Sequence, residues 1–441
     1  MAKFLDDPFG KFEKHTLDSG INVHVCQLPK RATQAFHFAI NAGTLHGPKG
    51  LAHFAEHIVA HSKGSGEATK LKEEFERIGG GFMGGWTSLD ATAYAFDVPA
   101  ERALVGKYLK RFSVYIMECT HEYDEKIENG IFLAERNERV RSPFQEKLRK
   151  QRSTAIMHDH PFGDQLSLLF GSPEEITGRN PADVKNFYLK YYSACNCDIF
   201  TAGPLAAGEV VESLVKANWQ KYEKGKRCGP LSHYEPHEPL LKSHAFNSPE
   251  VQSTSFLTSR LYDTNIPRRF MLLARRALRK VSNDLLREQS GSVYSVRTNM
   301  ERWGNVHLLE LESMGLQKNR IQEAFLLYKN IFETIESSAF SKIFDYVQES
   351  MKNASLYEEF ITRDIPQTAH ERILNYGKII SNREISESVQ QVKIDEVRNI
   401  LMELHPLKTF TRWILPSGVQ PPAGVPLLDI DETIASLEKK I

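Results

Sequence analysis

Two histidines and a glutamate lie close together in the segment Gly50-Leu51-Ala52-His53-Phe54-Ala55-Glu56-His57. Residues three and four apart share one face of a helix, so His53 and His57 can direct their imidazoles at one point with Glu56 beside them. A catalytic zinc ion takes three protein ligands and leaves one position for water, and a carboxylate that is not a ligand can accept the proton of that water. The segment therefore predicts a zinc site with His53 and His57 as ligands and Glu56 as the general base.

A third ligand has to come from elsewhere in the chain. The segment from Glu125 to Glu138 offers several carboxylates in a helical pattern, and Glu128 and Glu135 lie seven residues apart, on one face. The alternative for these glutamates is a charged, solvated helix surface. The alternative for the histidine pair is an ordinary packed or solvated helix face. The two segments support each other because a metal site needs ligands from both.

The bulk composition is that of an ordinary globular protein. The 441 residues, 41% of them hydrophobic, can bury a sizeable core, and this length suggests two to three domains. Lysine plus arginine and aspartate plus glutamate both total 56, so there is no global basic field to attract nucleic acid or anionic lipid. We therefore expect no nucleic acid and no membrane among the partners.

The N-terminal residues and the cysteines indicate where in the cell the protein is expected. The first ten residues lack the apolar stretch of a secretory signal, and no segment has the length and hydrophobicity of a transmembrane span. The five cysteines are an odd number scattered through a long chain, which argues against a disulfide framework. We expect a cytoplasmic protein whose thiols are structural.

Apolar periodicity indicates which elements position the histidines. Alternation predicts strands, spacings of three and four predict helices, and glycine runs end them. The predicted elements are a turn at 16–20, a strand near 21–25, helices over 51–59 and 68–78, a strand over 94–98, helices through most of 101–194 and a strand over 197–202.

A proline-rich stretch divides the chain. Between residues 229 and 241, Pro230, Pro236 and Pro239 stand among polar residues, a composition typical of an extended linker. Beyond it the order of elements recurs, and the predicted elements are a strand over 253–257, a helix over 268–287, strands over 293–297 and 307–311, and further helices.

These patterns predict an α+β protein of two similar-looking α/β sandwich halves, each a mainly antiparallel sheet packed by helices. The first half, residues 1–228, would be the catalytic zinc-binding domain. A linker would occupy 229–247, and a second α+β domain would occupy 248–441.

The order His-x-x-Glu-His and its surroundings resemble the pitrilysin/insulinase family of metallopeptidases, the inverzincins, which includes the processing peptidases and their bacterial relatives. Residues 50–57 match the family's Gly-Leu-Ala-His-Phe-x-Glu-His, and the resemblance continues over nearly the whole chain. It implies a zinc peptidase with one Zn²⁺ per chain, in which Glu135 is the third ligand. It also implies that Glu128 orients a ligand histidine. Glu138 is the alternative ligand if the helix phase differs.

A second block, residues 285–296, resembles the family's Leu-Arg-Glu-x-x-Gly-x-x-Tyr. The resemblance implies that Arg287 and Tyr294 reach across from the second half to hold the substrate near the zinc. A guanidinium can donate to a peptide carbonyl, and a phenol can donate to the oxyanion of a tetrahedral intermediate. The alternative is a helix-end arginine in a salt bridge and a core tyrosine on a strand.

Two positions depart from the family pattern. Gly84-Gly85 stands where many members have Asn-Ala, so a side-chain contact to the substrate backbone is missing, although an edge strand there can still pair with a peptide. His46 stands where an acidic residue is usual, and the sequence offers no physical account of it.

The resemblance implies hydrolysis of internal peptide bonds without a covalent intermediate. It also implies pairing, because the family's chambers contain two such two-domain units and this chain carries one. Three hypotheses follow: a homodimeric zinc endopeptidase acting on peptides or unfolded segments, the catalytic subunit of a heterodimer with an inactive homologue that matures a specific peptide precursor, and a non-catalytic scaffold subunit. Retention of every site residue named above argues against the third.

Overall fold

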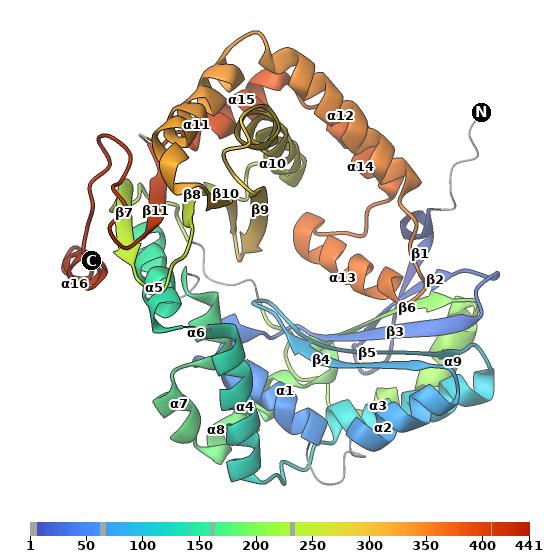
Figure 1. Ribbon diagram of the computed structural model, residues 1–441. Coiled ribbons are helices and arrows are strands. Elements are labelled where there is room, and N and C mark those ends of the chain that lie inside the picture. The colour runs from blue at the N-terminus through green and yellow to red at the C-terminus, as the bar shows by residue number, and fades with distance from the viewer. Residues whose placement is uncertain are drawn as a thin grey trace. The chain divides into compact units, whose positions relative to one another are not determined.

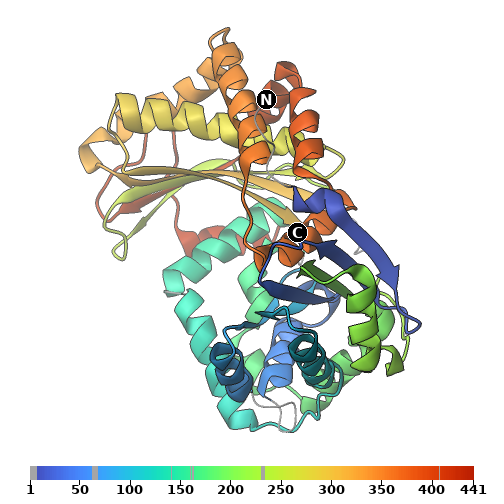
Figure 2. The same ribbon diagram turned by 90° about the vertical axis from the view of Figure 1, so that its right-hand side faces the viewer.

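The computed structural model describes residues 7–61, 68–140, 142–158, 160, 163–229, 234–406 and 408–441. The chain forms two compact units. Unit 1 comprises Met1–Arg139, Gln165–Leu231 and Glu358–Asn382, and unit 2 comprises Val140–Asp164, Ser232–Tyr357 and Arg383–Ile441. Each unit combines one sheet with helices (Figures 1 and 2). The expected α+β class with two sheet-and-helix halves is confirmed.

The two units exchange segments of the chain. Helix α5 (Pro143–Met157) falls in the expected first domain but belongs to unit 2, where its Phe144 packs with Phe246. Helix α13 (Asp364–Tyr376) falls in the expected second domain but belongs to unit 1. Periodicity shows that a helix has an apolar face but not which core that face joins. The linker at 229–247 stays a prediction, and its residues 230–233 lie outside the described part of the chain.

Unit 1 is built on a six-stranded sheet with the order β1-β2-β6-β3-β5-β4. Neighbouring strands are antiparallel except β2 and β6, which are parallel. The strands are β1 Phe12–Thr16, β2 Asn22–Gln27, β3 Thr33–Ile40, β4 Gly81–Thr87, β5 Thr92–Pro99 and β6 Cys197–Gly203. The predicted hairpin after residue 16 and the strands near 94–98 and 197–202 are confirmed, and β4 lies at an edge of the sheet.

Helices cover both faces of this sheet. Figure 1 shows α1, α2 and α3 on one face and α13 on the other. The first face is the main apolar core, whose buried residues include Phe54 of α1 together with Phe38, Phe96 and Phe112. The helices of unit 1 are α1 Leu51–His61, α2 Ala68–Arg77, α3 Arg102–Met117, α4 Glu125–Val140, α6 Gln165–Phe170, α7 Pro173–Thr177, α8 Pro181–Tyr191, α9 Ala207–Lys216 and α13, with short helical turns at Pro8–Lys11, Thr44–His46, Ala194–Asn196 and Trp219–Lys221.

Unit 2 repeats this topology. Its five-stranded sheet has the order β7-β11-β8-β10-β9, in which β7 and β11 are parallel and the other neighbours antiparallel. The strands are β7 Ser243–Ser248, β8 Thr254–Asp263, β9 Ser295–Trp303, β10 Val306–Leu316 and β11 Phe410–Pro416. Without β1, the sheet of unit 1 has the same chain order and the same strand directions, so the recurrence read from the sequence is a recurrence of topology.

The helices of unit 2 surround a second core that includes Trp413 and Tyr328. The expected helix over 268–287 is α10, which passes into a π-helical segment, η6. The helical elements are α5, α10 Arg268–Asn283, η6 Asp284–Gln289, η7 Lys318–Arg320, α11 Ile321–Glu336, α12 Phe340–Tyr357, α14 Asn382–Gln390, α15 Ile394–Glu403 and α16 Ile430–Glu438. In the described part of the chain, no helix has the length and hydrophobicity needed to cross a membrane. All five cysteines are free thiols.

Candidate metal centre

Helix α1 is fixed in place by its apolar residues and by the glycine before it. Leu51, Phe54 and Ile58 are buried in the core of unit 1. Gly50 has a φ of 72°, and a Cβ atom there would lie 2.2 Å from the carbonyl oxygen of Phe170. Only glycine fits this close approach without strain. Burial of the apolar face therefore determines which way the histidine face of α1 points.

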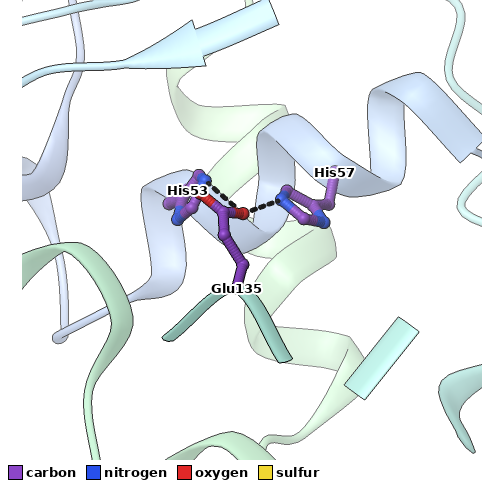
Figure 3. Close-up of side chains that lie close together, drawn as sticks. All are labelled: His53, His57 and Glu135. Atoms are coloured by element: carbon purple, nitrogen blue, oxygen red, sulfur yellow. Dashed lines mark ion pairs between the residues drawn. The ribbon is translucent and has the colours of Figure 1, made fainter. Parts of the chain in front are cut away.

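The predicted ligands converge (Figure 3). Oε2 of Glu135, on α4, lies 3.7 Å from Nε2 of His53 and 3.3 Å from Nε2 of His57. One ligand atom from each of the three side chains falls within 4.8 Å of the other two. Glu138, the alternative ligand, is exposed and outside this cluster. The structure therefore brings together His53, His57 and Glu135.

The hydrogen bonds of His53 leave its inward nitrogen free to bind a metal. Its Nδ1 donates to the carbonyl oxygen of Leu169 at 3.3 Å, because a carbonyl oxygen can only accept. The proton is therefore on Nδ1 and the lone pair is on Nε2, which faces Glu135. Burial, followed by the neighbouring His57, lowers the pKa of His53 to about 3, so the ring is neutral. A neutral imidazole is the form that binds zinc.

Glu135 is the charged member of the cluster. The pKa of Glu135 is lowered to about 2, and the hydrogen bond with His57 makes the largest contribution. Arg139, one turn along α4, donates to its other oxygen, Oε1, at 2.8 Å. The carboxylate is thus ionised and oriented. Two imidazoles with one carboxylate form a donor set that fits Zn²⁺ and leaves a coordination position for water.

Glu56 lies beside the cluster rather than in it. Its Oε2 is 3.7 Å from Nε2 of His53 and accepts a hydrogen bond from Oγ1 of Thr87 at 3.3 Å. Its side chain is 9% exposed, and burial raises its pKa from 4.5 to about 7. A carboxylate with a pKa near neutrality can both accept and release a proton at physiological pH.

Glu128 lies one layer behind the ligands. It is buried, and its Oε2 is 3.9 Å from Nδ1 of His57 and 2.9 Å from Nδ1 of His61. In the described residues, Nδ1 of His57 forms no hydrogen bond. A small movement of Glu128 would let its carboxylate accept from this nitrogen. His61 was not predicted as a site residue, although it lies four residues after His57, at the same spacing as His53 and His57.

The two departures noted in the sequence have structural explanations. A Cβ atom at Gly85 would lie 2.7 Å from Oε1 of Glu56 and 2.8 Å from the ring of Tyr94, so only glycine lets β4 pass this close to Glu56. Gly84 has a φ of 73° at a bulge in β4, where a Cβ would meet open space. His46 binds its own loop, because its Nδ1 accepts from the N–H of Gly43 at 3.0 Å.

Arg287 and Tyr294 lie in unit 2, away from its core. Arg287 is on the π-helical segment η6 and its side chain is 56% exposed. Tyr294 precedes β9 and is 81% exposed, although its backbone N–H donates to the carbonyl of Met314. The expected alternative of a core tyrosine is therefore wrong. Exposure leaves both side chains available to a ligand, and their substrate-binding roles stay predictions.

Residues 25–168 match the family model of insulinase, peptidase family M16. This region contains all three residues of the cluster, Glu56 and Glu128. Over this region the chain matches the pitrilysin/insulinase family. An uncharacterised zinc protease of Rickettsia bellii is 21% identical over 254 residues, which cover 56% of this chain and 58% of that protein. The probable zinc protease PqqL of Escherichia coli is 25% identical over 191 residues, covering 40% of this chain and 19% of PqqL. The aligned part is thus less than two thirds of the length of each of these two relatives.

Solved structures of low sequence identity have the same fold. The first half of the periplasmic protease PqqL from E. coli has a TM-score of 0.74 at 16% identity, covering 99% of this chain and 97% of that one. A peptidase M16 inactive domain from Pseudomonas fluorescens has a TM-score of 0.75 at 15% identity, covering 93% and 99%. The fold is therefore shared by an M16 protease and an inactive M16 domain, and the cytoplasmic location expected for this chain stays a prediction.

Proposed function

We propose that this M16 protein is a zinc-dependent endopeptidase that hydrolyses peptides or unfolded protein segments. The main support for the proposal is that His53, His57 and Glu135 converge. The buried Glu56 lies beside this cluster. When bound by these three side chains, Zn²⁺ would supply Lewis acidity, which makes water more acidic and polarises a carbonyl group.

The chain's own residues would handle the proton. Glu56 accepts a proton from the attacking water and passes it to the leaving amine. Its raised pKa supports this role, because the protonated and ionised forms are both accessible near neutral pH. Thr87 holds one oxygen of Glu56 by a hydrogen bond, which restricts the carboxylate to one side of the cluster.

Edge strand β4 is the proposed binding site for the substrate backbone. One side of β4 pairs with β5, and an extended peptide can add along its other side by β-augmentation. The close approach of Gly85 to Glu56 places this strand next to the general base. In the proposal, Arg287 donates to a substrate carbonyl and Tyr294 donates to the developing oxyanion.

Pairing is also part of the proposal. This chain covers 50% of the full PqqL structure and 49% of a pitrilysin structure, so those chains are about twice the length of the matching region. A homodimer would supply a second unit of the same size. The alternative is a heterodimer with an inactive homologue, which would mature a specific peptide precursor.

The first test is hydrolysis of a mixed peptide library by the purified, zinc-loaded chain, with products identified by mass spectrometry. We expect internal cleavages. The Glu56→Gln variant should lower kcat by about 10²- to 10⁴-fold while zinc content, measured by atomic emission, is unchanged.

Glu138→Gln is the matched control, since this exposed carboxylate is outside the cluster. An active Glu56→Gln enzyme that still holds zinc would reject the general-base assignment. If the zinc-loaded wild-type chain cleaves no peptide alone but cleaves peptides together with a co-purifying homologue, that result supports the heterodimer.

A further inference from the structure

Helix α10 of unit 2 has a strongly cationic face. Its sequence, Arg268–Asn283, contains five arginines, one lysine and no acidic residue. At 3.6 residues per turn, Arg269, Arg275, Arg276 and Arg279 fall within roughly one third of the helix circumference. The opposite side carries the buried residues Met271, Leu273, Ala274, Ala277, Leu278, Val281 and Ser282. Burial of this apolar side directs the four arginines, the α10 arginine face, outward.

The α10 arginine face differs from other arginines of the chain in its ion pairing. In the described part of the chain, none of its four guanidinium groups forms an ion pair, whereas Lys280 of the same helix pairs with Asp284 at 2.6 Å. Elsewhere, exposed arginines such as Arg139 and Arg383 have a carboxylate partner, and the whole chain has zero net charge.

The arginines are also close enough to repel one another. Burial lowers the pKa of Arg275, and Arg276, Arg268 and Arg279 lower it further. Like charges held together without a counter-ion cost free energy, which an anionic ligand would recover. The α10 arginine face is therefore suited to bind several negative charges.

The spacing suits a short acidic peptide. Arg269 and Arg279 are ten residues apart, which is about 15 Å along a helix. An extended peptide covers that length with about five residues. The planar guanidinium group matches a carboxylate in bidentate geometry. Helix α10 also leads directly into η6, the segment that carries Arg287.

We propose that the α10 arginine face binds an acidic segment of the polypeptide substrate. The inference rests on the proposed function and adds a substrate class to it, namely peptides that carry a cluster of Asp or Glu residues. A polypeptide is favoured over nucleic acid because the chain as a whole is neutral and matches a family of peptidases.

The test compares two fluorogenic peptides with one cleavable core, flanked either by Asp and Glu or by Ser and Asn. Wild-type enzyme should prefer the acidic peptide, and the preference should shrink as salt is raised. Replacing Arg275, Arg276 and Arg279 by Gln should lower kcat/KM for the acidic peptide by about tenfold, since each exposed ion pair contributes only a small part of the binding energy and three are removed. Cleavage of the neutral peptide should stay the same.

The matched control removes three positive charges elsewhere in unit 2, at the exposed lysines Lys318, Lys342 and Lys439. Circular dichroism checks that both triple variants are folded. An equal loss for both peptides, or the same loss in the lysine variant, would overturn the inference.

Direct binding separates this inference from the proposed function. Binding of the labelled acidic peptide to the Glu56→Gln protein is measured by fluorescence anisotropy, which requires no hydrolysis. Weaker binding to the protein that also carries the three arginine substitutions supports the inference, even if the wild type cleaves nothing. Binding that is absent, or unchanged by the substitutions, refutes it. Much tighter binding of a single-stranded oligonucleotide of equal charge would also refute it, in favour of a nucleic-acid surface.

Discussion

Helices α1 and α10 follow equivalent strands in two sheets of the same topology, yet their polar side chains are of different types. Helix α1 follows β3 and α10 follows β8, and these strands hold the same position in the shared strand order. Helix α1 presents His53, Glu56 and His57, whereas α10 presents arginines. The topology therefore positions a helix at this place in each unit, and the side chains decide whether that helix holds a metal.

The polar groups of the two helices also differ in how they are satisfied. The side chains of His53 and Glu56 are 7% and 9% exposed, and each has hydrogen-bonding or charged neighbours within unit 1. Buried polar groups need such partners because desolvation is costly. The four residues of the α10 arginine face are at least partly exposed, and they form no ion pair with the described residues. A peptidase M16 inactive domain has a similar fold, so the fold by itself does not establish activity.

Removing one of the predicted zinc ligands should leave unit 1 unable to bind the metal. Loss of even an outer-shell partner costs about 10- to 100-fold in metal affinity, so His53→Ala or Glu135→Ala should cost more. We expect both variants to purify without zinc and without activity, as measured by atomic emission and peptide hydrolysis. Full zinc content in either variant would show that the ligand set is wrong. Glu138→Ala, on the same helix as Glu135, should behave as wild type.

The burial of Glu56 should make the stability of the metal-free protein depend on pH. The folded pKa, about 7, lies above the ordinary 4.5, so the folded state holds the proton more tightly and loses stability as pH rises from 4.5 to 7. Glu56→Gln removes this penalty. At pH 8 it should raise the free energy of unfolding by on the order of 3 kcal/mol, and at pH 4 by almost nothing. Urea unfolding of the two metal-free proteins at both pH values measures the effect, and a gain of equal size at both would contradict it.

Adding a methyl group at Gly85 should displace the base without removing it. The new Cβ would lie 2.7 Å from Oε1 of Glu56, so the carboxylate or the strand has to move. A misplacement of about 1 Å can cost about 100-fold in rate, and we expect a kcat loss of that order with zinc retained. Gly130→Ala is the control, since a Cβ there meets nothing within 4 Å. A fully active Gly85→Ala enzyme would show that β4 can shift to accommodate the methyl group without displacing Glu56.

The smallest expected effect comes from the layer behind the ligands. Glu128→Gln removes the carboxylate nearest to Nδ1 of His57. Zinc affinity, measured by competition with a chelator, should fall by about tenfold. Glu125→Gln, exposed in the first turn of the same helix, is the matched control. Unchanged affinity in Glu128→Gln would leave this carboxylate bound to His61 alone.

Much of the site could be predicted because its parts are local. His53, Glu56 and His57 lie within one and a half turns of a helix, and that spacing fixes a shared face wherever the helix is placed. The same holds for Glu128 and Glu135 on α4. The strands near 21–25 and 94–98 were also predictable, since alternation identifies a strand that lies against a core. The sequence by itself thus determined the chemistry of the donor set and the class of the fold.

Only the tertiary structure shows the features that depend on contacts between segments far apart in the sequence. Periodicity could not show that α5 and α13 pack in the opposite units from those expected, because an apolar face does not specify its partner. It could not show why Gly85 is a glycine, since the reason is the carboxylate of Glu56, 29 positions away on another element. The sequence also could not show that the α10 arginine face forms no ion pair with the described residues, because ion pairs form between residues that are close in space and not necessarily in sequence.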